Sequence, residues 1–182
     1  MIGDKEVNSM GYARILKDND GKPSGYRECD GEVVFMPKQQ SYENTFRRIK
    51  IDVETMEVLN HDFIKDSEFV YYFTHSTETS YAVRLKTCKN PAAFTILPDG
   101  YTKDDDRVYY CQVTVKRAIP QSFTVLRDGY ARDDQHVFWG NCLLHVDRDS
   151  FNVLEDGYAE DMYHYIHGIV VTKKMGVEAN RL

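Results

Sequence analysis

Short apolar and aromatic stretches alternate with polar, turn-forming segments along most of the chain. Three such stretches begin with a phenylalanine, at residues 94–97, 123–126 and 151–154, and each is followed by an Asp-Gly pair. A further apolar stretch comes about eight residues later, as in Val108-Tyr109-Tyr110. Stretches of this length that are rich in β-branched and aromatic residues and bounded by turn residues are typical of β-strands. The pattern therefore predicts many short strands.

The pattern recurs along the chain, and the leading residues Phe94, Phe123 and Phe151 are 29 and 28 residues apart. Two more divergent copies precede them, one from Met56 and one from Gly25, of which the latter lacks the leading Phe-x-Val-Leu. A fixed period of about 20–50 residues indicates a repeat protein, in which each unit buries its apolar faces against its neighbours. We predict a single domain, 1–182, in which about residues 25–168 form five degenerate repeats: about 25–52, 53–90, 91–119, 120–147 and 148–168.

Each repeat is predicted to consist of antiparallel strands joined by tight turns. Asp-Gly at 99–100, 128–129 and 156–157 is a strong turn signal, because glycine adopts positive φ without steric conflict. Further hairpin turns are expected at residues 104–107, 133–136 and 161–163. The predicted core positions are Phe94, Phe123, Phe151, Leu97, Leu126 and Leu154. The fold class is thus mainly β, with repeated antiparallel β-hairpin units stacked into one sheet-rich domain.

Two insertions lengthen the early copies. The first, residues 38–52, fits either a short helix at 42–49 or another strand. The second, residues 74–89, contains a strand-like segment at 80–85.

The recurring Tyr-Ala-Lys/Arg-Asp-x-x-x-Val-Tyr-Tyr pattern, clearest at residues 101–110, 130–139 and 63–72, resembles the DKNYY repeat family of bacterial proteins. The similarity covers residues 53–168. The Lys-Asn of the family core is replaced in this sequence by Asp105-Asp106, Asp134-Gln135 and Met162-Tyr163. The resemblance transfers no catalytic or ligand-binding residues. It implies a genomic association, since such small proteins often lie beside polymorphic toxins and act as immunity proteins.

The acidic excess of the chain is confined to its second half. The net charge is −6, and residues 94–168 contain 13 Asp and Glu against 7 Lys and Arg, which leaves 16 of each sign elsewhere. Such a field repels nucleic acid and attracts a basic protein, although an acidic surface kept for solubility explains it too. Tyrosine and tryptophan are frequent binding anchors. The expected partner-binding residues are Asp104, Asp105, Asp106, Tyr130, Asp133, Asp134, Trp139, Tyr158 and Asp161.

No pattern of residues indicates catalysis or a cofactor. The chain has no G-x-S-x-G and no glycine-rich phosphate loop, and its four cysteines are not spaced as zinc ligands, so we expect free thiols. The Asp runs lack the alternating spacing of a calcium loop. His164 and His167 fall on opposite sides of a strand and cannot share a metal without a bulge. We therefore predict no enzymatic activity, no cofactor and no metal.

These observations favour a non-enzymatic protein-binding module, in particular an immunity protein that neutralises a toxin with a basic surface, such as a nuclease. The alternatives are a structural scaffold without a toxin partner and a carbohydrate-binding β protein that uses Tyr and Trp platforms. The first residues carry charges of both signs and no apolar core of a signal peptide, and no apolar run approaches the length of a membrane span. A cytoplasmic location without membrane contact is expected.

Overall fold

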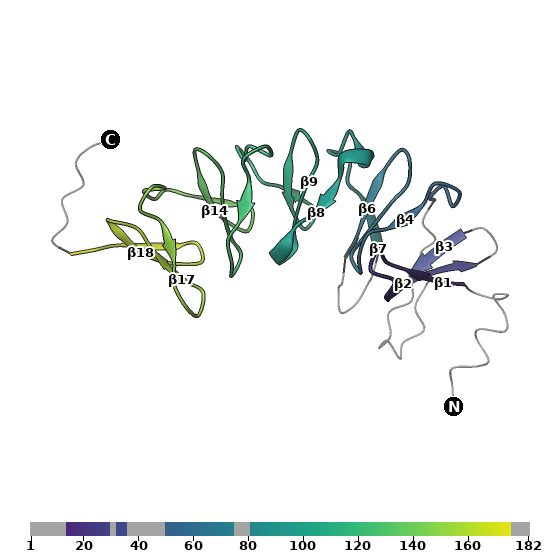
Figure 1. Ribbon diagram of the computed structural model, residues 1–182, viewed down its shortest axis with the longest axis horizontal. Coiled ribbons are helices and arrows are strands. Elements are labelled where there is room, and N and C mark those ends of the chain that lie inside the picture. The colour runs from purple at the N-terminus through teal and green to yellow at the C-terminus, as the bar shows by residue number, and fades with distance from the viewer. Residues whose placement is uncertain (1–13, 30–31, 36–49, 75–80, 176–182) are drawn as a thin grey trace, which may run out of the picture. The chain divides into compact units, whose positions relative to one another are not determined.

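The computed structural model describes residues 14–29, 32–35, 50–74 and 81–175, which form 19 short strands in five antiparallel sheets (Figure 1). These residues contain no α-helix and one 3₁₀ turn, η1 (Pro91–Ala93), while the segment η2 (Pro98–Gly100) has non-helical dihedral angles at Asp99 and belongs to an Asp-Gly turn. The predicted mainly β fold of repeated hairpin units is confirmed. The strand-like segment at 80–85 contains strand β7, whereas the helix or strand considered at 42–49 lies outside the described residues.

The chain divides into two compact units, residues 1–92 and 93–182. The first unit contains a three-stranded sheet, β1 (Arg14–Lys17), β2 (Pro23–Cys29) and β3 (Glu32–Phe35). It also contains a four-stranded sheet, β4 (Glu57–Val58), β5 (Phe63–Lys65), β6 (Val70–Thr74) and β7 (Tyr81–Arg84). In both sheets, strands that are consecutive in the sequence are neighbours.

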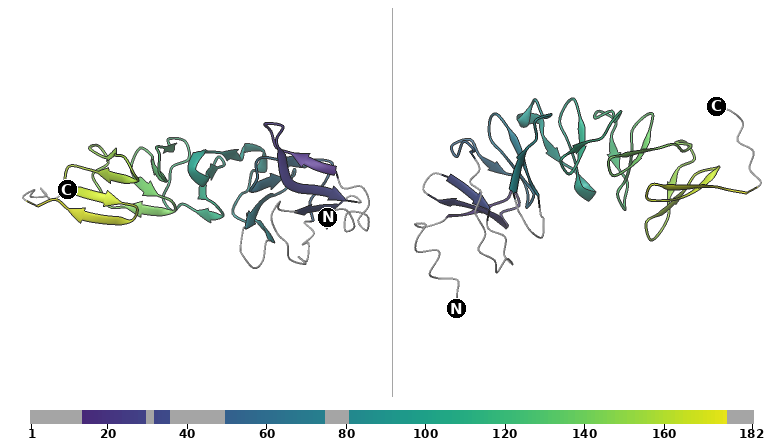
Figure 2. Two further views of the ribbon diagram at one scale, coloured as in Figure 1. Left: turned by 90° about the horizontal axis from the view of Figure 1, so that it is seen from below. Right: turned by 180° about the vertical axis from the view of Figure 1, so that it is seen from behind.

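The second unit contains three four-stranded sheets that follow one another in chain order (Figure 2). The third sheet has strands β8 (Thr95–Ile96), β9 (Tyr101–Lys103), β10 (Val108–Tyr110) and β11 (Val113–Thr114). The fourth has β12 (Thr124–Val125), β13 (Tyr130–Arg132), β14 (Val137–Trp139) and β15 (Cys142–Leu144). The fifth has β16 (Asn152–Val153), β17 (Tyr158–Glu160), β18 (His164–His167) and β19 (Val170–Lys173). Each predicted repeat contains the central hairpin of one sheet, while the organisation as a single domain stays a prediction.

The Asp-Gly pairs form type I′ turns, and the three copies have the same backbone conformation. Asp99, Asp128 and Asp156 have φ of 55–56°, and the following glycines have φ of 74–78°. Tyr130 N–H donates to the carbonyl of Arg127 across the turn at 2.9 Å, and Tyr158 makes the same bond to Glu155. Two consecutive residues with positive φ match the right-handed twist of the flanking strands. The prediction of equivalent glycines is confirmed.

Each four-stranded sheet ends in a fourth strand, and of these four strands the sequence predicted only β7, within residues 80–85. In the second unit it follows a two-residue turn that begins with a residue at positive φ, namely Cys111, Gly140 or Gly168. Tyr110 pairs with Val113 across the first of these turns, and Trp139 pairs with Cys142 across the second. Only Gly140-Asn141 carries the usual glycine-asparagine turn signal, so the three copies do not share a visible motif here.

The core of the second unit lies between successive sheets. The predicted burial of Phe94, Phe123 and Phe151 is confirmed, since they are 5–7% exposed. The prediction for Leu97, Leu126 and Leu154 is wrong in degree, because all three are only half-buried. Leu97 and Leu126 pack at the margins of the two core clusters of this unit.

Each interior sheet has two faces with separate partners. One core cluster joins Tyr101, Val108 and Val115 of the third sheet to Phe123, Ala131 and Phe138 of the fourth. The next joins Tyr130, Val137 and Leu144 of the fourth sheet to Phe151, Ala159 and Ile166 of the fifth. We call the face that carries Tyr101 or Tyr130 the trailing face of its sheet. The opposite face, which carries Ala131 and Phe138 in the fourth sheet and Ala159 and Ile166 in the fifth, is called the leading face. The first unit follows the same rule, since Tyr26 and Val33 pack against Ile64 and Tyr71.

Candidate functional site

Three of the expected partner-binding aspartates are turned into the protein. Asp104, Asp133 and Asp161 begin the hairpin turns and are only 1–4% exposed. In the middle copy, Asp133 Oδ1 accepts hydrogen bonds from the N–H groups of Gln135 (2.8 Å) and His136 (2.7 Å). Its Oδ2 accepts one from the N–H of Ile119 at 2.9 Å. These carboxylates satisfy backbone groups of the turn and of the preceding segment, so they are not available to a partner.

Asp161 makes the same contacts in the last copy. Its carboxylate accepts hydrogen bonds from the N–H groups of Asp147 and Tyr163 and lies 2.9 Å from His164 Nδ1. Burial alone would raise the pKa of Asp161, but the hydrogen bonds from His164 and from these backbone N–H groups outweigh it and lower the pKa below its ordinary value. This carboxylate is held ionised as part of the turn.

Tyr130, expected as an exposed anchor, is fully buried. Its hydroxyl donates to the carbonyl of Gly157 (3.0 Å) and accepts from the N–H of Gly168 (2.8 Å), which are turns of the following sheet. Tyr101 occupies the same position one repeat earlier and donates toward the carbonyls of Gly129 and Gly140. Burial raises the pKa of both phenols above their ordinary value. These hydroxyls connect successive sheets and are not a binding site.

Trp139 is exposed, and it belongs to a row of rings beside the Asp-Gly turns. Its indole Nε1 donates to the carbonyl of Asp128 at 3.1 Å, and its ring lies against Gly129 and Gly168. Tyr110 lies in the same way against Gly100 and Gly140, and His167 lies near Gly157. Trp139 is 37% exposed, so part of its ring faces solvent. Because glycine has no side chain, each ring packs directly on the backbone of the turns.

Exposed carboxylates surround this row. Asp99, Asp128, Glu155 and Asp156 are all exposed, and they lie in the Asp-Gly turns or directly before them. We call this side of the second unit, made by these four acids with Tyr110, Trp139 and His167, the Asp-Gly edge. Arg127 is the basic residue within these turns, and its guanidinium donates to the carbonyls of Val153 and Leu154 and lies 3.8 Å from Asp128. The edge therefore combines an aromatic row with an acidic rim.

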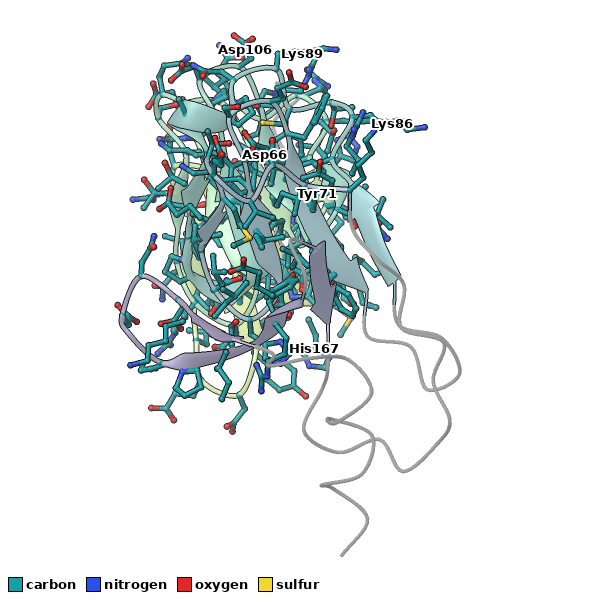
Figure 3. All side chains as sticks on the ribbon, turned by 90° about the vertical axis from the view of Figure 1, so that its right-hand side faces the viewer. Asp66, Tyr71, Lys86, Lys89, Asp106 and His167 are labelled. Carbon is teal, nitrogen blue, oxygen red and sulfur yellow. The ribbon has the colours of Figure 1, made fainter. Side chains whose placement is uncertain are left out.

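The other expected acids lie on the opposite edge. Asp105, Asp106 and Asp134 are exposed in the turns that Asp104 and Asp133 begin, at the far end of the three-residue strands. Figure 3 shows Asp106 and His167 at opposite edges of the second unit. Of the expected partner-binding residues, Trp139 and Tyr158 therefore lie away from Asp105, Asp106 and Asp134, and whether any of them binds a partner stays a prediction. The acids beside the aromatic residues are those of the Asp-Gly turns.

Tyr158 belongs to a second exposed surface, the trailing face of the fifth sheet. Cross-strand pairing places six side chains on this face, which we call the end face: Tyr158, Glu160, Tyr165, His167, Val170 and Thr172. Tyr158 stacks on His167 with ring centroids 4.5 Å apart, and the Nζ of Lys174 lies 2.7 Å from Glu160 and 4.7 Å from the Tyr165 ring centroid. Tyr158 is 52% exposed and Tyr165 57%.

Among the described residues, no group of three or more His, Cys, Asp or Glu is arranged to hold a metal ion. His164 is engaged by Asp161, and His167 stacks on Tyr158. Cys111 and Cys142 are free thiols, as expected. Within the same described ranges, no helix has the length and apolar character needed to cross a membrane.

The repeated hairpins, the aspartate-anchored turns and the following fourth strands together span the segment where the sequence resemblance was strongest. Residues 101–176 match the DKNYY family. The expected resemblance is confirmed over this range, so the DKNYY segment contains the last three central hairpins, the end face, and the Asp-Gly edge except Asp99. No curated protein and no solved structure is significantly similar to the chain.

The sequence did not point to the residues of the end face other than Tyr158, or to the acids of the Asp-Gly turns as a group. A usable signal exists for the end face. Val137 and Leu144 of the fourth repeat are buried against the fifth repeat, and the last repeat has Tyr165 and Thr172 at the equivalent positions. The replacement of both apolar interface residues in the last copy is the signal.

Proposed function

We propose that this protein is a non-enzymatic binding module that neutralises a protein partner, as an immunity protein against a bacterial toxin with a basic surface such as a nuclease. The observation that carries the proposal is the Asp-Gly edge, where the exposed carboxylates of Asp128 and Asp156 flank the turns on which the Trp139 ring packs. The genomic association implied by the DKNYY resemblance supports the same function.

The edge has the two components of a charged protein interface. Trp139 provides a large ring whose position is fixed by its hydrogen bond to the Asp128 carbonyl, so little side-chain entropy is lost when a partner covers it. The carboxylates around it steer a basic partner and pair with Lys or Arg at the rim. Arg127 does not cancel this field fully, since four exposed acids lie in or beside these turns.

Growth rescue tests the proposal. The toxin gene that the proposal predicts beside the gene for this protein is expressed in a sensitive host together with the wild-type chain or with the double variant Asp128→Lys/Asp156→Lys. We expect the wild type to restore growth and the variant to fail, with Trp139→Ala weakening rescue separately. The matched control is Asp105→Lys/Asp106→Lys, which makes the same charge change on the opposite edge and should still rescue.

Binding kinetics measured with the purified protein and toxin separate the contribution of charge from that of packing. Raising the ionic strength should slow association of the toxin more than it speeds dissociation, because steering is screened by salt. Rescue that survives the change at Asp128 and Asp156 would move the interface away from the Asp-Gly edge. A locus without a toxin gene, together with a pull-down that recovers no toxin, would favour the scaffold alternative.

A further inference from the structure

The end face is the trailing face of a repeat that has no following sheet among the described residues. In the third and fourth sheets this face is covered by the next sheet, and its tyrosines, Tyr101 and Tyr130, are fully buried. In the fifth sheet the same position is Tyr158, which is 52% exposed. The end face is therefore the exposed equivalent of a face that is covered twice within this unit.

Exposed apolar surface gathers around this face. The described residues include nine large hydrophobic side chains that are exposed, and six of them lie between positions 158 and 175: Tyr158, Met162, Tyr165, Ile169, Val170 and Met175. Three of these, Tyr158, Tyr165 and Val170, lie on the end face itself, and exposed apolar side chains gathered on one face of a folded protein mark an interaction site. Tyr158, Tyr165 and Val170 lie on adjacent strands of one face, so a flat partner can cover them together.

The chemistry of the face suits a second copy of itself. Its single carboxylate, Glu160, is paired with Lys174 at 2.7 Å, so two copies can approach without the repulsion that the net charge of −6 causes elsewhere. A basic partner would find no unpaired acid on this face. The face also carries hydroxyl donors, Tyr158 and Tyr165, beside an acceptor, Glu160. Donors, acceptors and rings on one patch allow a two-fold interface in which each copy satisfies the other.

We propose that the protein forms a two-fold symmetric homodimer in which the end faces of two copies pack against each other. The second copy covers the face that the next sheet covers in the third and fourth sheets. The ring of Tyr165 and the side chain of Val170 are buried at its centre, and the Tyr158–His167 stack packs at its side. His167 belongs to both surfaces, but Trp139 and the four acids of the Asp-Gly edge lie outside the end face and remain free for the partner of the proposed function, which does not depend on this dimer.

Sedimentation equilibrium of the full chain across the micromolar range tests the dimer. The wild type should sediment with twice the 21.2 kDa mass of one chain. Tyr165→Glu and Val170→Asp should each weaken the dimer at least about tenfold, because a charge would be buried at its centre. Increased salt should leave the dissociation constant nearly unchanged, in contrast to binding at the acidic edge.

Val113→Asp is the matched control, because Val113 holds the position of Val170 in the third repeat and is 46% exposed. This variant should remain a dimer. Circular dichroism and thermal unfolding establish that each variant is folded. A wild-type chain that stays monomeric throughout this range overturns the proposal, as does a dimer that Val113→Asp disrupts and Tyr165→Glu and Val170→Asp leave intact. Neither outcome bears on growth rescue, so the two proposals fail separately.

Discussion

The trailing faces of the fourth and fifth sheets are built from equivalent positions and have opposite environments. Tyr130 is fully buried and its hydroxyl bonds two turns of the next sheet, whereas Tyr158 has the same turn geometry and is half exposed. At the neighbouring position, Val137 is buried and Tyr165 is exposed. The local sequence sets the conformation of the hairpin, but the following sheet decides which residues become core. Substitutions at paired positions test this difference.

The largest contrast is expected between Phe123 and Tyr158. Phe123 is 7% exposed and packs on the rings of Tyr101 (5.3 Å) and Phe138 (5.8 Å). Phe123→Ala should lower the free energy of unfolding by about 3–5 kcal/mol. Tyr158→Ala should lower it by less than about 1 kcal/mol, since the ring is already in solvent. Urea unfolding at protein concentrations that keep association constant measures both, and comparable losses would contradict the assignment of the faces.

A somewhat smaller contrast is expected within one turn. Asp133→Ala removes the acceptor for three backbone N–H groups and should cost about 2–3 kcal/mol. The adjacent Asp134→Ala, on an exposed side chain, should stay within about 0.5 kcal/mol of the wild type. Thermal or urea unfolding compares the two variants. Equal effects would mean that Asp133 does not anchor the turn.

The turn of the last repeat should respond to pH. The pKa of Asp161 is lowered in the folded protein, so its contribution to stability is present above the ordinary aspartate pKa and is lost as the pH falls through the lowered value. Protonation keeps part of the hydrogen bonding, so the loss should be smaller than the effect of deleting such a carboxylate. The free energy of unfolding should therefore fall less between pH 6 and acid conditions in Asp161→Asn than in the wild type. Parallel pH profiles would contradict this.

Removal of the tyrosine hydroxyl should affect the free energy of unfolding differently on the trailing faces of the fourth and fifth sheets. Tyr130→Phe leaves the Gly157 carbonyl and the Gly168 N–H without this partner and should cost about 1–2 kcal/mol. Tyr158→Phe should have no measurable effect on unfolding at concentrations where the chain is monomeric. Chemical denaturation of both variants makes the comparison, and a loss in Tyr158→Phe equal to that in Tyr130→Phe would show that Tyr158 is bonded like its counterpart.

The smallest effect is expected in the turns before the fourth strands. Cys111 has φ of 52° where the later repeats have Gly140 and Gly168. Cys111→Gly should stabilise the protein by up to about 1 kcal/mol, because it relieves a backbone conformation that L side chains disfavour. Gly140→Ala should destabilise it, since the added methyl would lie 3.2 Å from the Tyr110 ring at positive φ. A shift of the melting temperature in the same direction for both variants would contradict this explanation.

The elements that the sequence predicted are those whose signals are local. The Asp-Gly turns and the aspartate turns depend on a few adjacent residues, and the leading phenylalanines repeat at a fixed spacing. Burial was harder to predict. Asp133 and Asp134 look alike in the sequence, and only the first has its carboxylate turned toward backbone N–H groups. Tyr130 and Tyr158 likewise occupy equivalent positions, and they differ because a further sheet covers Tyr130.

The bridging hydroxyls of Tyr101 and Tyr130 hydrogen-bond to main-chain atoms of the neighbouring turns. These hydrogen bonds do not depend on which side chains the neighbouring turns carry, provided that the backbone conformation of those turns is kept. Duplicated copies are therefore free to diverge, as Tyr110, Trp139 and His167 have done at one position, without losing their junction. Because the junctions between repeats do not depend on particular side chains, a gene can gain or lose whole repeats during evolution while the remaining repeats still pack together.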